Sequence, residues 1–140
     1  MDTKFPIAAA SLLPHAGPMC CIDTLLASSK KAACAMVTLF PDHSLLRGGV
    51  LDEAAYLELA AQTAGAMQGY DDHIRGCPPK PGFLVGVQDF HIHGEARVGD
   101  ILHIDVTLTA ELAEVSVLSA TVRRDAELLA EGRLKVFVPA

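Results

Sequence analysis

The sequence lacks tryptophan, and aromatic residues make up only 5% of its 140 residues. Hydrophobic residues nevertheless account for 51% of the chain, so the core must be built from aliphatic side chains. A chain of this length can bury one substantial core. We therefore expect residues 1–140 to form a single domain.

Basic residues are also scarce. The chain has 11 Lys and Arg against 17 Asp and Glu, which gives a net charge of -6. Binding to nucleic acid needs clustered positive charge, so this balance argues against a nucleic-acid partner. A small molecule or another protein is the expected partner.

Cysteines are few, and long apolar runs are absent. The adjacent pair makes a poor disulfide, and ligand spacing for a metal is missing among the four cysteines, Cys20, Cys21, Cys34 and Cys77. No apolar run is long enough to span a membrane, and we find no export signal. The sequence thus predicts a reduced cytoplasmic protein with no metal or other cofactor.

The order of hydrophobic patterns predicts an α+β fold with one long helix. The helix should begin after Asp52 as N-cap and end near Asp71, because residues 76–82 are rich in Pro and Gly. Residues 41–49 are expected to form a loop before it. Period-two patterns predict antiparallel strands packed against the helix over residues 32–40, 83–93, 101–112, 114–123 and 128–138.

Glu58 is the only charged residue between Ala54 and Tyr70, within the predicted helix. At about 100° per residue, one helix stripe carries Leu51, Ala54, Glu58, Gln62, Gly65 and Gly69. Two glycines on one line suggest that another backbone packs closely there. Because burying a lone carboxylate is costly, Glu58 is either a functional group or a surface residue beside Gln62.

The loop before the helix supplies His43, a possible partner for Glu58. Histidine titrates near neutral pH, so such a pair could transfer protons, with the helix N-terminus close to a developing oxyanion. An ordinary exposed loop histidine is the alternative interpretation of His43.

Four segments in order resemble the hot-dog-fold β-hydroxyacyl-ACP dehydratases, especially the variant group found with aryl polyene and related lipid-like synthesis. They are LLPHAGPMCCID, DHSLLRGGVLDEAAYLELAAQTAGAMQGY, GFLVGVQDFHIHGEARVGD and the closing strands. The resemblance implies a long helix wrapped by an antiparallel sheet, a homodimer with active sites at its interface, and an acyl carrier protein as partner. The implied reaction removes water from a 3-hydroxyacyl thioester.

The resemblance also implies roles for individual residues. His43 would take the C2 proton, Glu58 would protonate or orient the leaving hydroxyl, and Gln62 would position Glu58, with His and Glu commonly from opposite subunits. His15 is the second candidate base. Further substrate contacts are implied for the backbone of the helix start and for the segment after the loop, namely Glu53, Ala54, Phe83, Val85 and Gly86.

Two other functions stay open on this sequence. A thioesterase on the same fold would use the helix carboxylate to activate water and would not need His43. A non-catalytic relative would bind acyl chains or serve only as a partner subunit. Fold resemblance alone does not decide among the three.

Overall fold

The computed structural model describes residues 5–13, 19–78, 80 and 82–139. It confirms the predicted α+β fold, with one long helix against an antiparallel sheet. The elements in chain order are β1 (Ile7–Ala8), the 3-10 helix η1 (Ala9–Ser11), β2 (Thr24–Ser28), β3 (Ala32–Thr38), β4 (Leu46–Arg47), β5 (Val50–Leu51), α1 (Glu53–Ile74), β6 (Phe83–Ile92), β7 (Ile101–Leu112), β8 (Val115–Arg124) and β9 (Glu127–Phe137).

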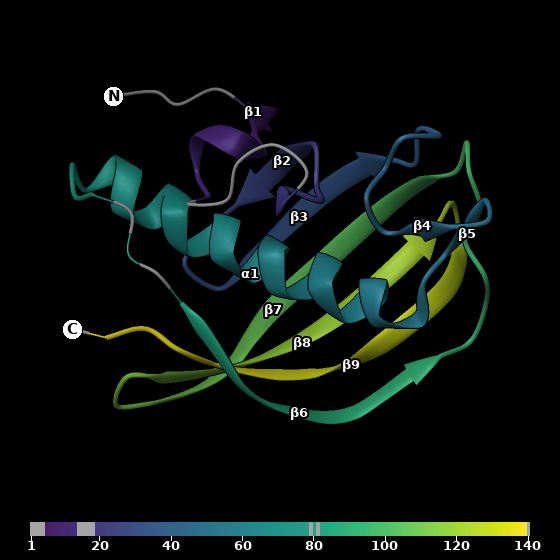
Figure 1. The fold of residues 1–140 in the computed structure, drawn as a ribbon. Coiled ribbons are helices and arrows are strands. Elements are labelled where there is room, and N and C mark those ends of the chain that lie inside the picture. Colours follow the sequence, from purple (N-terminus) through teal and green to yellow (C-terminus); the bar gives the residue numbers. More distant parts are fainter. Residues whose placement is uncertain (1–4, 14–18, 79, 81, 140) are drawn as a thin grey trace.

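The main sheet has the strand order β1-β2-β3-β7-β8-β9-β6, and its strands pair antiparallel. It curves around α1, which lies across its inner face (Figure 1). Buried and more exposed residues alternate along β3, in the first half of β7 and in the middle of β8, as expected when one face of a strand packs on a core. The predicted strand 101–112 agrees with β7, and the other predicted strand bounds are within two residues.

The helix α1 begins where the sequence predicts and ends three residues later than Asp71, at Ile74. Asp52 is the N-cap residue with an extended backbone, but the predicted side-chain cap is wrong. Its side chain makes no capping hydrogen bond, and the Ala55 N–H is instead bonded to the Asp52 carbonyl oxygen at 2.9 Å. The first turn of α1 therefore keeps N–H groups that its own cap does not satisfy.

The predicted loop 41–49 contains a short strand, which is a correction to the sequence prediction. Strands β4 and β5 pair as a two-stranded hairpin directly before α1 (Figure 1). Val50 of this hairpin also pairs with Arg97, and the Leu51 N–H donates to the Ala96 carbonyl oxygen at 2.9 Å. Strands of two residues carry too little periodicity to be recognised in a sequence.

The N-terminal strap, residues 5–13 and 19–22, runs along the helix stripe that carries the two glycines. The rings of Phe5 and Tyr70 lie 5.0 Å apart. A Cβ added to Gly69 would overlap the Leu12 carbonyl oxygen, and one added to Gly65 would lie 3.1 Å from the Leu13 side chain. Gly69 therefore allows the close approach of a second backbone, as the sequence suggested, whereas Gly65 makes room for a side chain.

Strand β6 forms one edge of the sheet and pairs only with β9 within the described chain. Five of its large hydrophobic side chains are between 41% and 58% exposed, namely Phe83, Leu84, Val85, Val87 and Ile92. An exposed apolar edge strand is a ready surface for pairing with another strand.

The glycine stripe yields a stability prediction. Gly69→Ala should lower the free energy of unfolding by about 2 kcal/mol, because the new methyl group meets backbone that cannot rotate away. Gly65→Ala is the matched control: its methyl group meets only the end of a flexible side chain, and Ala favours a helix by about 1 kcal/mol over Gly. Urea unfolding measures both, and equal midpoints would contradict the close backbone contact.

Candidate active site

Gln62 lies at the centre of a hydrogen-bonded cluster and is only 3% exposed. Its Nε2 donates to Glu58 Oε2 at 2.8 Å and to the Met19 carbonyl oxygen at 2.7 Å. Its Oε1 accepts the Cys21 N–H at 2.7 Å. Two acceptors face the nitrogen and one donor faces the oxygen, so the contacts fix the orientation of this amide. The structure thus brings Gln62 and Glu58 together, one helical turn apart.

Glu58 itself is partly exposed, whereas the helix around it is largely covered. The other side of α1 packs into the core through fully or nearly fully buried side chains, among them Tyr56, Ala60 and Thr63. The alternative of a plain surface strip is therefore wrong for Gln62, which the strap covers, while Glu58 is partly exposed.

His43 is half-buried and has a backbone contact at each ring nitrogen. Its Nε2 lies 2.9 Å from the Cys21 carbonyl oxygen, and the Leu45 N–H donates to its Nδ1 at 3.2 Å. A carbonyl oxygen can only accept and a backbone N–H can only donate, so the neutral ring carries its proton on Nε2. The ring lone pair is on Nδ1, where the contact with Leu45 is long for a hydrogen bond.

Cys21 joins these two groups of contacts. Its N–H is bonded to Gln62 and its carbonyl oxygen to His43. The hydrogen-bonded chain therefore runs from Glu58 through Gln62 and Cys21 to His43 within one polypeptide. Sequence reasoning placed Glu58, Gln62 and His43 near one another and missed Cys21 and Met19, whose peptide groups make the connection. The only indication of these two residues in the sequence is that they follow the Leu-Pro-His segment within a few positions.

The start of α1 lies beside this cluster. The Asp52 N–H donates to the Leu45 carbonyl oxygen at 3.0 Å, which ties the helix start to the His43 loop. Tyr56 fixes the other side, because its hydroxyl accepts the Ala96 N–H at 2.9 Å and donates to the Gly94 carbonyl oxygen at 3.3 Å. Glu53 and Ala54 are exposed in the first turn, where backbone N–H groups point along the helix axis.

Three of the remaining predicted site residues lie away from the Glu58 cluster. Phe83, Val85 and Gly86 are on the edge strand β6, where Phe83 and Val85 are more than half exposed. No hydrogen bond in the described part of the chain joins their side chains to the Glu58 cluster. His15 falls outside the described residues.

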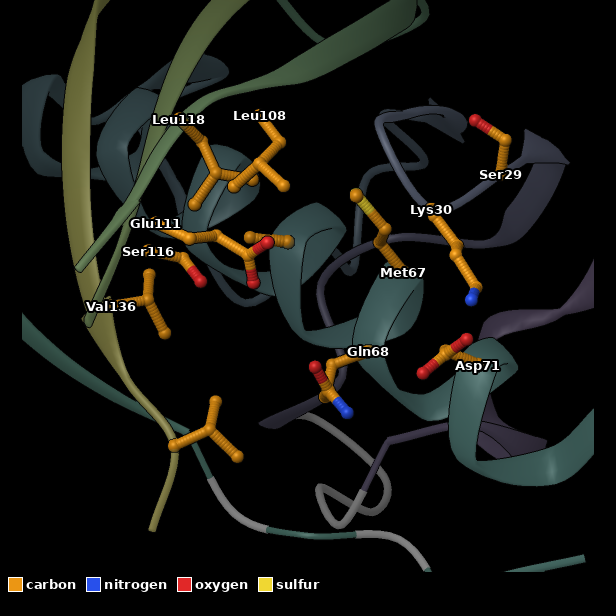
Figure 2. A pocket seen from close by; sticks show the side chains of 12 residues that line it. Ser29, Lys30, Met67, Gln68, Asp71, Leu108, Glu111, Ser116, Leu118 and Val136 are labelled. Atoms are coloured by element: carbon orange, nitrogen blue, oxygen red, sulfur yellow. The ribbon is translucent and has the colours of Figure 1, made fainter. Parts of the chain in front are cut away.

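A separate cavity of about 270 Å³ lies between the C-terminal half of α1 and β7, β8 and β9 (Figure 2). Leu108, Leu118 and Val136 form part of its apolar wall, while Lys30 and Asp71 stand at its polar side. At about 100° per residue, Met67 and Asp71 of its lining lie about 180° and 140° around the helix from Glu58. The cavity is therefore distinct from the Glu58 cluster.

The thiol of Cys21 is poorly suited to act as a nucleophile. Burial raises the pKa of this thiol above its ordinary value, the Ser44 hydroxyl opposes that shift, and the negative charge of Glu58 adds to it. The reactive form of cysteine is the thiolate, which a raised pKa disfavours. The contribution of Cys21 to the site is therefore its backbone.

The described residues hold no cluster suited to a metal ion: no group of three or more His, Cys, Asp or Glu residues among them is arranged to bind one. His93 is hydrogen-bonded to Glu131, with 2.8 Å between Nε2 and Oε2. None of the described helices is long and apolar enough to cross a membrane.

The arrangement of one long helix on a curved antiparallel sheet is the hot-dog fold, as its structural relatives show. The dehydratase heterocomplex ApeI:P from Xenorhabdus doucetiae matches with a TM-score of 0.89 at 22% identity, over 99% of this chain and 93% of that one. A hypothetical thioesterase with coenzyme A from Streptococcus pneumoniae has a TM-score of 0.67 at 11% identity, over 83% and 84% of the two chains.

A sigma28-regulated virulence protein from Campylobacter jejuni shares the same fold, with a TM-score of 0.69 and 14% identity over 94% of this chain and 86% of that one. No curated protein matches the sequence. The ApeP-like family, described as ApeP dehydratase, matches residues 7–140, and the chain belongs to this family. The chain is thus a dehydratase, an enzyme of the hydro-lyase kind.

The raised pKa of Cys21 predicts slow alkylation. At about pH 8, iodoacetamide should label the exposed Cys77 well before Cys21, because burial and Glu58 disfavour the Cys21 thiolate. Labelling of Cys21 should speed up as the pH rises, and also in Glu58→Gln, which removes a negative charge. Peptide mass spectrometry follows both thiols, and equal rates for Cys21 and Cys77 would contradict the placement of Cys21.

Proposed function

We propose that this dehydratase removes water from 3-hydroxyacyl thioesters and yields trans-2-enoyl thioesters. The hydrogen-bonded connection between Glu58 and His43 supports the proposal most directly, because elimination of water needs a base at C2 and an acid at the C3 hydroxyl. Membership in a dehydratase family supports the same reaction class.

In the proposed reaction, His43 Nδ1 takes the proton from C2. The Nε2–H of the ring stays bonded to the Cys21 carbonyl oxygen, which favours the imidazolium that forms. The substrate displaces the long contact between Leu45 N–H and Nδ1. The nitrogen that acts as base, Nδ1, thus differs from the nitrogen that donates to Cys21, Nε2.

Glu58 acts on the leaving group. Glu58 gives the C3 hydroxyl a proton that it has taken up from solvent as the C3–O bond breaks, so water leaves and a carbon–carbon double bond forms. Gln62 Nε2 holds Oε2 and leaves Oε1 to face the substrate. The proton that Glu58 takes up from solvent and the proton that His43 afterwards releases to solvent balance, which restores the resting enzyme.

The N-terminus of α1 supports the thioester carbonyl in this scheme. Removal of the C2 proton places negative charge on the carbonyl oxygen, which backbone N–H groups stabilise. The N–H groups of Glu53 and Ala54 stand in the first turn, where the Asp52 side chain provides no cap. They can therefore receive that oxygen.

An acyl carrier protein is the proposed source of the acyl chain. Arg47 and Arg97 lie on either side of Val50, because Val50 pairs with both of them. Cross-strand partners project to the same side, so two guanidinium groups flank the hairpin that leads into α1. Such positive charge beside the His43 loop suits an acidic carrier, even though the chain is acidic as a whole.

A second subunit is proposed to pair through β6. The exposed apolar side chains of this strand would be covered, and its open edge would be hydrogen-bonded. A homodimer is the simplest assembly. The similar ApeI:P structure is a heterocomplex, which makes a related but different chain the other candidate for this place.

A thioesterase reaction is the second candidate function. Backbone groups contact both nitrogens of His43, and a reaction in which Glu58 alone activates water would leave those contacts intact. Release of free thiol without enoyl product, at a rate that His43→Ala leaves unchanged, would identify this reaction.

Enoyl formation tests the proposed reaction. The purified protein should convert a 3-hydroxyacyl thioester to its enoyl product, detected by absorbance and mass spectrometry. Glu58→Gln and His43→Ala should each lower kcat by about 10²- to 10⁴-fold, since each removes one proton-transfer group. Glu114→Gln, in the exposed β7–β8 turn, is the matched control. A wild-type rate in Glu58→Gln would rule out this site.

Pairing through β6 predicts a dimer that a charge disrupts. Val85→Lys places an ammonium group on the exposed edge strand and should shift the protein from dimer to monomer in analytical ultracentrifugation. Leu112→Lys, which alters another highly exposed apolar residue outside β6, should leave the dimer intact. A Val85→Lys variant that sediments with the wild type would place the interface elsewhere.

A further inference from the structure

The β6–β7 turn, residues 93–100, is hydrogen-bonded to the start of α1. The Leu51 N–H, two residues before the helix, donates to the Ala96 carbonyl oxygen at 2.9 Å. The Ala96 N–H in turn donates to the buried hydroxyl of Tyr56, in the first turn of α1, at 2.9 Å. That hydroxyl donates to the Gly94 carbonyl oxygen at 3.3 Å. The position of the β6–β7 turn therefore determines where α1 begins.

Arg124, the last residue of β8, holds the β6–β7 turn against the sheet. Its Nη1 donates to Asp100 Oδ2 at 2.7 Å and to the Glu95 carbonyl oxygen at 3.0 Å. Its Nη2 donates to Glu127 Oε1, on the first residue of β9, at 2.7 Å. Glu95 and Asp100 stand on either side of Ala96 in the chain. One guanidinium group thus fixes the bonded segment from both ends, which its several N–H groups in one plane allow.

Charge and burial strengthen these contacts. The Arg124 side chain is only 27% exposed. Burial alone would raise the pKa of Asp100, but the Arg97 N–H and the Arg124 guanidinium outweigh this effect and hold that pKa below its ordinary value. Burial also raises the pKa of Tyr56, and the bond to the Ala96 N–H and the charge of Arg124 oppose that shift. The charge of Arg124 therefore acts on the same hydroxyl that anchors the helix start.

We infer that Arg124 is a positioning residue for the proposed dehydration, because it fixes the helix start whose backbone N–H groups receive the thioester carbonyl oxygen. The inference rests on the proposed function. The restraint extends to the His43 loop, because the Asp52 N–H donates to the Leu45 carbonyl oxygen at 3.0 Å. Loss of Arg124 would leave the partly buried Asp100 carboxylate without its cation, and the β6–β7 turn would loosen.

Arg124→Met tests the inference by its effect on turnover. The kcat for enoyl formation, per folded enzyme, should fall about 10- to 100-fold, because a small displacement of groups that position the substrate is costly. KM should change less than about threefold, since the oxyanion forms only in the transition state. Arg124→Lys keeps the charge but cannot reach all of these acceptors, so it should recover only part of kcat, and it serves where Arg124→Met does not fold.

Arg133→Met is the matched control. It removes another Arg–carboxylate pair, with Asp89 on β6, and leaves the contacts of Arg124 intact, so kcat should equal that of the wild type. A purely structural role of Arg124 would lower the unfolding midpoint of Arg124→Met and leave the kcat of the folded variant unchanged. That result would overturn the inference.

Amide hydrogen exchange followed by NMR needs no substrate and separates this inference from the proposed function. Arg124→Met should speed the exchange of the Leu51 and Ala96 N–H groups at least about fivefold, the effect of one lost hydrogen bond. Arg133→Met should leave both rates unchanged. Wild-type exchange rates in folded Arg124→Met would overturn the inference. An inactive wild-type enzyme would refute the proposed dehydration, while the exchange rates would still decide whether Arg124 fixes the helix start.

Discussion

The candidate site depends on the burial of one amide. Gln62 is almost inaccessible to water, and a buried amide must find protein partners for its oxygen and its nitrogen. Glu58, Met19 and Cys21 supply them. The strap must therefore lie against α1 for the helix to fold with Gln62 inside, and the same contacts set the direction of the Glu58 carboxylate.

Packing at both ends of the helix stripe that carries Glu58 and Gln62 holds the strap against α1. Gly69 lets the strap backbone approach α1 where a larger residue would overlap it, and Gly65 leaves room for the Leu13 side chain. At the other end, the β4–β5 hairpin and Tyr56 hold the helix start beside the His43 loop. The sheet covers the remaining face of α1, so the helix has little freedom to rotate and redirect Glu58.

Much of the fold could be predicted from the sequence, because long periodic segments report which face of an element is buried. The helix and the strands β6 to β9 are of this kind. The Glu58 to Gln62 contact was also within reach, since residues four apart share a helix face. The β4–β5 hairpin was too short to leave a pattern. Asp52 matches a capping residue by type, yet its side chain makes no capping hydrogen bond.

The contacts made by backbone peptide groups could not be predicted from the sequence. Cys21 acts through its N–H and carbonyl oxygen, which every residue except proline possesses. Selection for the site therefore constrains the backbone at this position and the size of its side chain, but not the thiol. Among related sequences, we expect position 21 to hold various small residues but not proline. A comparison of residue identities would then miss the importance of this position.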